Sequence, residues 1–338
     1  MAICVAALLL VAACSSSTPI ETPTPKPTLG ATVTELIVAL GGSDAELRLE
    51  AAQRLGSLGD PAAVRPLAAA AVQEDQDVAM AAIPALAAIG GEEATDALIA
   101  LTGSIPEDDD YDGEDRFVAA IEGLGVVRGA AAVARLLALK VDEAVEGAAW
   151  LAVDAILERM TAADVAAIAA ALEDGDTALR LEAIDCLGAI GGPGAAEALI
   201  GQVASKDEEV RIAAIEALGE AGDRMATATL VKALKDKDLY YAASAALVEI
   251  YRDDAAPLLK YLKAKSTVKV YYALIRIGQD DTEDALVTAL QKYGTKDMAV
   301  DYLNCGNAKL EKAARRWAAA HGYTVITLPG GASVTWGS

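Results

Sequence analysis

Residues 207–223 read DEEVRIAAIEALGEAGD, and this stretch decides the fold. Its charged start is followed by apolar residues at three- and four-residue spacing, which is the period of one face of an α-helix. The stretch closes on Gly222 and Asp223, and glycine permits the left-handed backbone on which many helices end. It therefore predicts one amphipathic helix followed by a tight polar turn.

The same pattern returns along the chain from residue 44 onward, each time with a second helix behind it. The clearest other copies are RLEAAQRLGSLGD (48–60), MAAIPALAAIGG (80–91) and RLEAIDCLGAIGG (180–192). One marker leucine falls in each copy, at intervals of 27 to 38 residues: Leu55, Leu86, Leu124, Leu157, Leu187, Leu218, Leu247, Leu274 and Leu303. Residues 33–44, VTELIVALGGSD, precede the first full copy and predict a lone second helix that caps the array.

A pair of helices of this length cannot bury its apolar face alone, so successive pairs must stack. The chain is 54% hydrophobic but only 4% aromatic, which is typical of closely packed helices with small side chains. We therefore expect an all-α fold over residues 32–320, an α-solenoid wound as a right-handed superhelix.

The consensus D-x-x-V-R-x-x-A-x-x-A-L-G-x-ϕ-G-D, where ϕ is apolar, resembles HEAT repeats of the short type named after phycobilisome lyases. Residues 207–223 match it nearly throughout, and the resemblance covers residues 33–320. It implies the solenoid fold and says little about function, because repeat folds host many activities.

The amino terminus has the pattern of an export signal. Residues 1–13 are almost entirely apolar and end in small residues, and they are too few for a transmembrane helix. Val11-Ala12-Ala13-Cys14 resembles the lipobox of bacterial lipoproteins, which implies cleavage before Cys14 and lipidation of its thiol. Ordinary secretion and a buried helix are the alternatives. Residues 15–31 are rich in Pro, Thr and Ser and predict an extended tether. We expect an extracytoplasmic protein, lipid-anchored to the bacterial cell membrane or outer membrane.

Negative charge is concentrated in the first two thirds of the chain. Residues 1–205 hold 32 Asp and Glu against 10 Lys and Arg, whereas residues 206–338 hold 18 of each. A net charge of −22 argues against a nucleic-acid partner. Two interpretations stay open: the charge keeps an exposed surface soluble, or it attracts a cationic partner.

Three copies carry an Asp four residues before an Arg: Asp44 and Arg48, Asp176 and Arg180, Asp207 and Arg211. Asp at a helix start caps free backbone N–H groups, and the Arg one turn later can reach that carboxylate or the Asp of a neighbouring repeat. The pattern predicts a structural Asp/Arg ladder along the stack.

Tyrosines gather in the later copies. Six of the ten fall between residues 240 and 272, and the candidates for partner binding among them are Tyr240, Tyr241, Tyr271 and Tyr272. Tyrosine is favoured at recognition surfaces, yet large rings also fill a core that alanine leaves thin. Binding and packing are both open for this group.

Catalytic chemistry is excluded class by class. The single histidine, His321, lies at a helix end, and no Ser-His-Asp set, Cys-His pair, phosphate loop or CxxC spacing is present. HEAT-like deoxyhypusine hydroxylases hold two irons through His-Glu dipeptides, and this sequence has none. We expect no enzyme activity and no cofactor.

An acidic insertion occupies residues 106–115, PEDDDYDGED. Asp108, Asp110 and Asp112 follow the first half of an EF-hand loop, but the twelfth position is Ala119, where a bidentate Glu is required. A regular EF-hand is therefore excluded, and a weak calcium site or a solvated acidic loop remain as alternatives.

The final segment departs from the repeat. Residues 310–320 predict a last helix, and residues 321–338 predict a cap or tail with a possible β-hairpin around Pro329 to Gly331. Together these features predict a non-enzymatic scaffold that binds a protein partner on its concave face, which we expect the second helices to line. A structural spacer or assembly factor of the cell envelope and calcium-dependent adhesion through residues 106–115 are the alternatives. Contact with a membrane is expected through the lipid anchor only.

Overall fold

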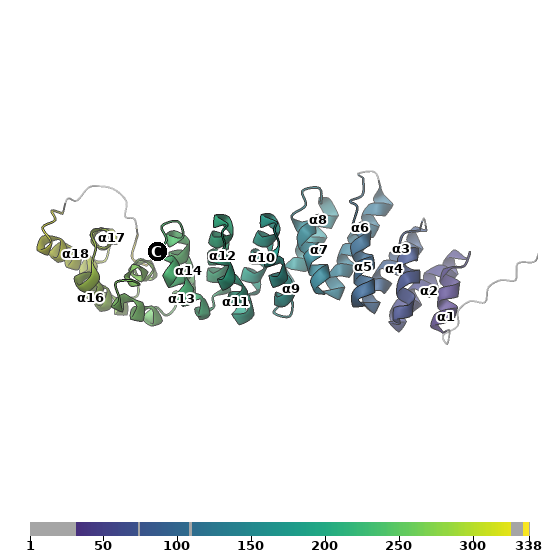
Figure 1. Ribbon diagram of the computed structural model, residues 1–338, viewed down its shortest axis with the longest axis horizontal. Coiled ribbons are helices and arrows are strands. Elements are labelled where there is room, and N and C mark those ends of the chain that lie inside the picture. Colours follow the sequence, from purple (N-terminus) through teal and green to yellow (C-terminus); the bar gives the residue numbers. More distant parts are fainter. Residues whose placement is uncertain (1–31, 74, 108–109, 326–333, 338) are drawn as a thin grey trace, which may run out of the picture.

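The computed structural model describes residues 32–73, 75–107, 110–325 and 334–337. Within these ranges the chain is helical with short turns, and none of the described residues lies in a β-strand. The helices follow one another as an elongated stack (Figure 1). The fold is an all-α solenoid, as the repeat pattern predicts. Cys14 and the tether at residues 15–31 lie outside the described residues.

The first helices of the repeats form one row of the stack. Each carries one of the nine marker leucines, and all of these but Leu303 are buried. The row consists of α2 (Ala45–Leu58), α4 (Gln76–Ile89), α6 (Tyr111–Val127), α8 (Gly147–Leu157), α10 (Thr177–Ile190), α12 (Glu208–Ala221), α14 (Tyr240–Tyr251), α15 (Tyr271–Ile277) and α17 (Lys296–Asn304).

The second helices form the other row, which the isolated helix α1 (Val33–Leu40) begins. It continues with α3 (Val64–Ala71), α5 (Gly91–Leu101), α7 (Ala130–Lys140), α9 (Val165–Ala170), α11 (Gly192–Gln202), α13 (Thr227–Ala233), α16 (Glu283–Tyr293) and α18 (Ala308–Ala320). The interval between Leu247 and Leu274 is the shortest, and its second helix is a 3-10 segment, η4 (Ala256–Lys263), instead of an α-helix.

Aspartates and glycines set the ends of the first helices. Asp44 and Asp207 precede α2 and α12, and their side chains accept hydrogen bonds from backbone N–H groups of the first turn. Gly59 and Gly222 follow the same helices with φ of 67° and 68°. A residue with a Cβ is strained in this left-handed region, so these glycines let the chain turn into the second helix.

Small residues bring the first helices close together. A Cβ placed on Gly219 of α12 would lie 2.8 Å from the Cα of Ala246 in α14, and one on Gly56 of α2 would lie 2.7 Å from the Cβ of Ala85 in α4. Real side chains do not approach so closely, so the backbones can meet only because glycine faces alanine. This contact explains why glycine follows the marker leucine in several repeats.

The first row is less closely packed at one junction. Helices α2 to α8 pack each on the next, and so do α10 to α15, but α10 contacts α7 and α9 more than it contacts α8. Helix α8 also lacks a side-chain cap, because Glu146 before it makes no cap hydrogen bond. In Figure 1, α8 and α10 stand further apart than α10 and α12. The stack is continuous here through the second row.

The carboxyl terminus folds back on the last repeats. The backbone N–H of Trp336 donates to the carbonyl oxygen of Cys305 at 2.8 Å, and that of Gly337 donates to the carbonyl of Ile275 at 3.0 Å. The described residues of the expected hairpin, 323–325 and 334–337, form no strand, and its turn at residues 329–331 lies outside the described ranges. The segment 334–337 thus binds helix ends instead of pairing as a strand.

None of the described helices combines the length and the apolar character that crossing a bilayer requires.

Candidate protein-binding surface

One apolar side chain per repeat is left partly exposed along the first row. It stands six residues before each marker leucine, so it occupies the same place on successive helices that run in the same direction. We call this set the apolar spine: Leu49, Met80, Val118, Leu151, Leu181, Ile212 and Tyr241. Leu151 is 62% exposed and Tyr241 is 68% exposed. Four of the seven also pack against the core, but part of each side chain stays accessible, and an apolar strip along seven successive helices indicates a contact surface.

Carboxylates without partners accompany the spine. Glu182 is one residue after a spine position, and Glu122, Asp185 and Glu216 are four residues after, one helical turn along the same face. Within the described part of the chain, none of the four has a hydrogen-bonding or ion-pair partner. We call them the flanking carboxylates.

A lysine of the second row lies near the middle of this surface, beside α8 and Glu182 of α10. The Lys140 ammonium, at the end of α7, pairs with the Asp154 carboxylate of α8, and its Nζ lies 3.8 Å from the ring centroid of Trp150. Lys140 is thus already engaged by a carboxylate and by an aromatic face. Lys140 lowers the pKa of Glu182, but burial raises it by a larger amount, so the net shift is upward. The pKa of Asp185 is raised by burial as well.

The predicted Asp/Arg ladder is present at one junction. The Arg48 guanidinium reaches across to Asp75, the cap of α4, with an Nη2–Oδ2 distance of 2.6 Å, and Nη1 also donates to Gln73. Asp44 itself caps α2 by accepting from the N–H of Leu47 at 3.2 Å. Here the Arg joins the Asp of the neighbouring repeat.

The other two arginines make different bonds. Arg180 donates to the hydroxyl of Ser205 at 2.8 Å, and Arg211 donates to the carbonyl of Ser205 at 3.1 Å. Asp176 caps α10 through the N–H of Ala178, while Asp207 accepts from the Thr177 hydroxyl at 2.9 Å, which lowers the pKa of Asp207. Neither arginine forms an ion pair with an aspartate in the described structure, because Ser205 and Thr177 offer nearer partners.

Three of the four candidate tyrosines are packed and one is exposed. Tyr271 and Tyr272 are 6% and 7% exposed, and Tyr240 is half-buried. Ring centroids of Tyr240 and Tyr272 are 5.3 Å apart, and those of Tyr271 and Tyr302 are 5.8 Å apart. The hydroxyl of Tyr271 donates to the Asp301 carboxylate at 2.6 Å, and burial raises the pKa of Tyr240 and of Tyr271. The structure therefore brings all four together in one cluster, but Tyr241 is the member that faces solvent and continues the apolar spine.

The comparisons with known proteins agree with this repeat geometry. Residues 33–113 and 197–270 match the family model described as HEAT repeats. These two segments contain HEAT repeats. A search of curated proteins finds no match.

The solved structures that match this chain include three that the alignment covers almost end to end. The complex of CpcE and CpcF of phycocyanin lyase from Nostoc sp. PCC7120 is 22% identical over 75% of this chain and 97% of that chain, with a TM-score of 0.33. Human deoxyhypusine hydroxylase in complex with glycerol is 16% identical over 86% and 96%, with a TM-score of 0.31. An engineered protein is 18% identical over 86% and 97%, with a TM-score of 0.25. Identities this low say nothing about a shared activity.

The acidic insertion between the second and third HEAT repeats is partly helical. Asp108 lies outside the described residues, Asp110 caps α6 by accepting from the N–H of Gly113 at 3.0 Å, and Asp112 is exposed in the first turn of that helix. An EF-hand needs a loop through its twelfth position, whereas residues 111–119 are α-helix. The expected loop at 106–115 thus ends at residue 110, and Asp112 cannot act as its fifth-position ligand.

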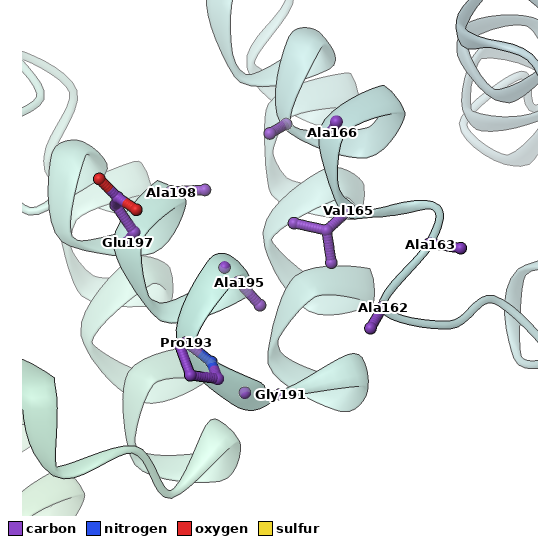
Figure 2. A pocket seen from close by; sticks show the side chains of 12 residues that line it. Ala162, Ala163, Val165, Ala166, Gly191, Pro193, Ala195, Glu197 and Ala198 are labelled. Carbon is purple, nitrogen blue, oxygen red and sulfur yellow. The ribbon is translucent and has the colours of Figure 1, made fainter.

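A hollow of about 480 Å³ lies between α9 and α11, where two second helices stand apart (Figure 2). Its lining is almost entirely alanine and glycine, with Val165 and Pro193, and Glu197 is its one ionisable side chain. One carboxylate cannot supply an acid and a base together, so the hollow has no catalytic set. No group of three or more His, Cys, Asp and Glu side chains that could hold a metal occurs among the described residues.

The two cysteines of the described repeats are free and buried. Burial and the neighbouring carboxylates Glu182 and Asp185 raise the pKa of Cys186 to about 12, and burial raises that of Cys305. A thiol that stays protonated is a poor nucleophile. His321 stacks on Trp317 with centroids 4.1 Å apart and its Nδ1 lies 2.8 Å from the Trp317 carbonyl oxygen, as a helix-end residue does.

Sequence reasoning missed the apolar spine. It counted apolar residues as core and placed the contact surface on the second helices. The signal was available in the sequence. The residue six positions before every marker leucine from Leu55 to Leu247 is apolar, although this position lies beside the buried face of its helix and stays at least partly exposed.

Proposed function

We propose that the protein is a non-enzymatic scaffold that binds a protein partner along its row of first helices. HEAT-repeat architecture fits a protein-binding role. The observation that carries the proposal is the apolar spine, seven equivalent and partly exposed apolar side chains on successive helices. Extended solenoid surfaces bind partners through many such shallow contacts.

The packing of the first row supports this row over the second. Its Gly–Ala contacts bring neighbouring first helices close together, so exposed apolar side chains at equivalent positions form a continuous strip. Our proposal therefore places the contact on the first row, in place of the second helices.

Export and anchoring are a separate part of the proposal. The apolar residues 1–13, the small residues before Cys14 and the Pro-rich tether support a lipoprotein held away from a membrane. Metabolic labelling with a fatty-acid analogue tests this part: we expect label on the wild-type chain and none on Cys14→Ala. Equal labelling of both proteins would remove the anchor from the proposal.

The binding role is tested by quantitative affinity capture from envelope extracts. Leu151→Asp places a charge on the spine, while Met225→Asp places one on an exposed apolar residue of the second row, which is 48% exposed. We expect Leu151→Asp to lose the partner that the wild type captures and Met225→Asp to retain it, with unchanged helical circular dichroism in both. If both variants capture the same proteins as the wild type, the first row is not the binding surface. If the wild type captures nothing, the elongated body acts as a spacer.

A further inference from the structure

The chemistry of the spine and its flanking carboxylates specifies the partner more closely. We propose that this surface binds a cationic amphipathic α-helix of a partner protein, with the centre of the contact on α10, α12 and α14. This inference rests on the proposed function, because it names the occupant of the same surface.

The positive charge of the partner follows from the unpaired carboxylates. Asp185 and Glu216 lie beside the spine without a hydrogen-bonding or ion-pair partner in the described structure, and the cation near Glu182 is Lys140, which is already paired with Asp154. Burial works against the ionised forms of Glu182 and Asp185. A lysine or arginine that docks beside them would supply the missing counter-charge at a site already partly desolvated, where charge pairs are strongest.

The basic groups near this surface are already engaged. Lys140 is held by Asp154 and Trp150, and the Arg180 and Arg211 guanidinium groups bond to Ser205 and neighbouring backbone. These side chains cannot neutralise the flanking carboxylates without giving up their present partners. The surplus of acidic over basic residues in the first 205 positions also attracts a basic partner from a distance.

The helical form of the partner follows from the spacing of the spine. Packed helices lie about 8–10 Å apart, so the spine side chains of α10, α12 and α14, which pack each on the next, recur at about that distance. Seven residues of an α-helix rise about 10.5 Å and return to the same face, which matches this repeat. An extended segment covers the same distance in about three residues, and residues three apart in a strand point to opposite faces. A helix with apolar residues every seven positions therefore meets every spine residue, whereas a strand meets every second one.

The exposed members of the spine are the apolar contacts of this helix. Leu181, Ile212 and Tyr241 stand in this order on α10, α12 and α14, two half-buried side chains followed by an exposed tyrosine. Two intervals of about 10 Å are spanned by a helix of about 14 residues. The three side chains form a shallow apolar track that a helix fills with one face.

The test uses two synthetic 21-residue helical peptides that differ only in charge. Both carry leucines at heptad spacing on one face; one has lysines beside them, the other glutamates. Binding to the full-length protein is measured by isothermal titration calorimetry in 50 mM salt. We expect the lysine peptide to bind with one-to-one stoichiometry and the glutamate peptide to bind at least about fiftyfold more weakly.

Variants of the protein locate the contact. Glu182→Gln with Asp185→Asn keeps the shape of both side chains and removes their charge, and Glu197→Gln does the same on α11, in the second row. We expect about tenfold weaker binding of the lysine peptide by the double variant and no change with Glu197→Gln. Tyr241→Asp should weaken binding by a similar factor, with circular dichroism confirming that each variant is folded.

Several outcomes overturn the inference. Equal binding of the two peptides removes the role of charge. If Glu197→Gln and the double variant lose the same affinity for the lysine peptide, the attraction is non-specific. A lysine peptide whose helix is broken by proline should bind at least about tenfold more weakly; binding as tight as that of the helical peptide removes the helical partner. If sedimentation shows a dimer that Leu151→Asp dissociates, the occupant is a second copy of this chain. If capture in extracts depends on Leu151 while the lysine peptide does not bind, the inference falls and the scaffold function stands.

Discussion

The closest helix contacts predict an unusual response to a substitution that ordinarily stabilises helices. Gly219 lies inside α12, where alanine is favoured over glycine by about 0.8–1.0 kcal/mol in the absence of other contacts. In this position, however, the new methyl group would lie 2.8 Å from the Cα of Ala246. We therefore expect Gly219→Ala to destabilise the protein.

The magnitude follows from the distance. Carbon atoms pack at about 3.5–4.0 Å, so α12 and α14 must separate by roughly 0.7 Å or more to admit the methyl group. Overpacking of this kind costs about 1–3 kcal/mol, which exceeds the helix-propensity gain, and the net loss in free energy of unfolding is about 1 kcal/mol. The contacted atoms belong to backbone and a Cβ, so no flexible side chain can move aside.

Urea unfolding followed by circular dichroism measures the effect, with Gly201→Ala as the matched control. Gly201 lies in the last turn of α11 and a Cβ there has no atom within 4 Å, so its replacement should stabilise the protein by up to about 1 kcal/mol. Gly188→Ala is intermediate, because its Cβ would lie 3.0 Å from the Cβ of Ala217. The midpoint should therefore fall in the order Gly201→Ala, wild type, Gly188→Ala, Gly219→Ala.

One result refutes this reasoning. If Gly219→Ala unfolds at the same urea concentration as Gly201→Ala, or at a higher one, the first row tolerates wider spacing. The close approach would then not determine the geometry of the stack.

Three further predictions follow from single side chains. The Ser244 hydroxyl is fully buried without a hydrogen-bond partner, so Ser244→Ala should raise the free energy of unfolding by about 1 kcal/mol, measured by urea unfolding; a loss of that size would contradict it. The pKa of Glu182 is raised on folding, so its ionised carboxylate destabilises the folded state once the pH rises above the unfolded pKa near 4.5. Glu182→Gln should therefore stabilise the protein at pH 7 but not at pH 3. Equal effects at both pH values would refute the burial argument. Tyr271→Phe removes the hydrogen bond to Asp301 and should lower the free energy of unfolding by about 1 kcal/mol in the same assay, whereas Tyr241→Phe should have almost no effect because its ring faces solvent.

The fold was predictable because its determinants are local and repeated. Marker leucines such as Leu218 define the buried face, Asp207 and Gly222 define the helix ends, and each repeat supplies the same information again. The shortest interval, between Leu247 and Leu274, also had a visible consequence, since its second helix is 3-10. The looser junction of α8 and α10 was not predictable, because it depends on how α10 packs against α7 and α9.

The candidate site was predictable only in part, because exposure depends on neighbours. The tyrosine cluster was located from spacing alone, but which ring faces solvent depends on the contacts of Tyr272 with Tyr240 and Tyr241. The Asp/Arg spacing correctly predicted that the aspartates cap helices. It did not predict the partner of Arg180, which is Ser205, a loop residue that the consensus does not fix. The apolar spine lies beside the core positions of the same helices. Which of these positions is buried depends on how adjacent repeats pack.

The chemistry that joins neighbouring repeats changes along the rod, and this change separates fold from function. Arg48 joins α2 to the cap of α4 by an ion pair, Thr177 joins α10 to the cap of α12 by a hydroxyl bond to Asp207, and Tyr271 joins α15 to α17 through Asp301 and Tyr302. Gly–Ala contacts hold α2 on α4 and α10 on α12 beside two of these groups, so the joining side chain is not the only contact there. The surface beside them varied in the same way, from carboxylates on α6 to α12 to Tyr241 on α14. A partner helix bound across these repeats consequently meets charge at one end and an aromatic ring at the other, which fixes the direction in which it lies.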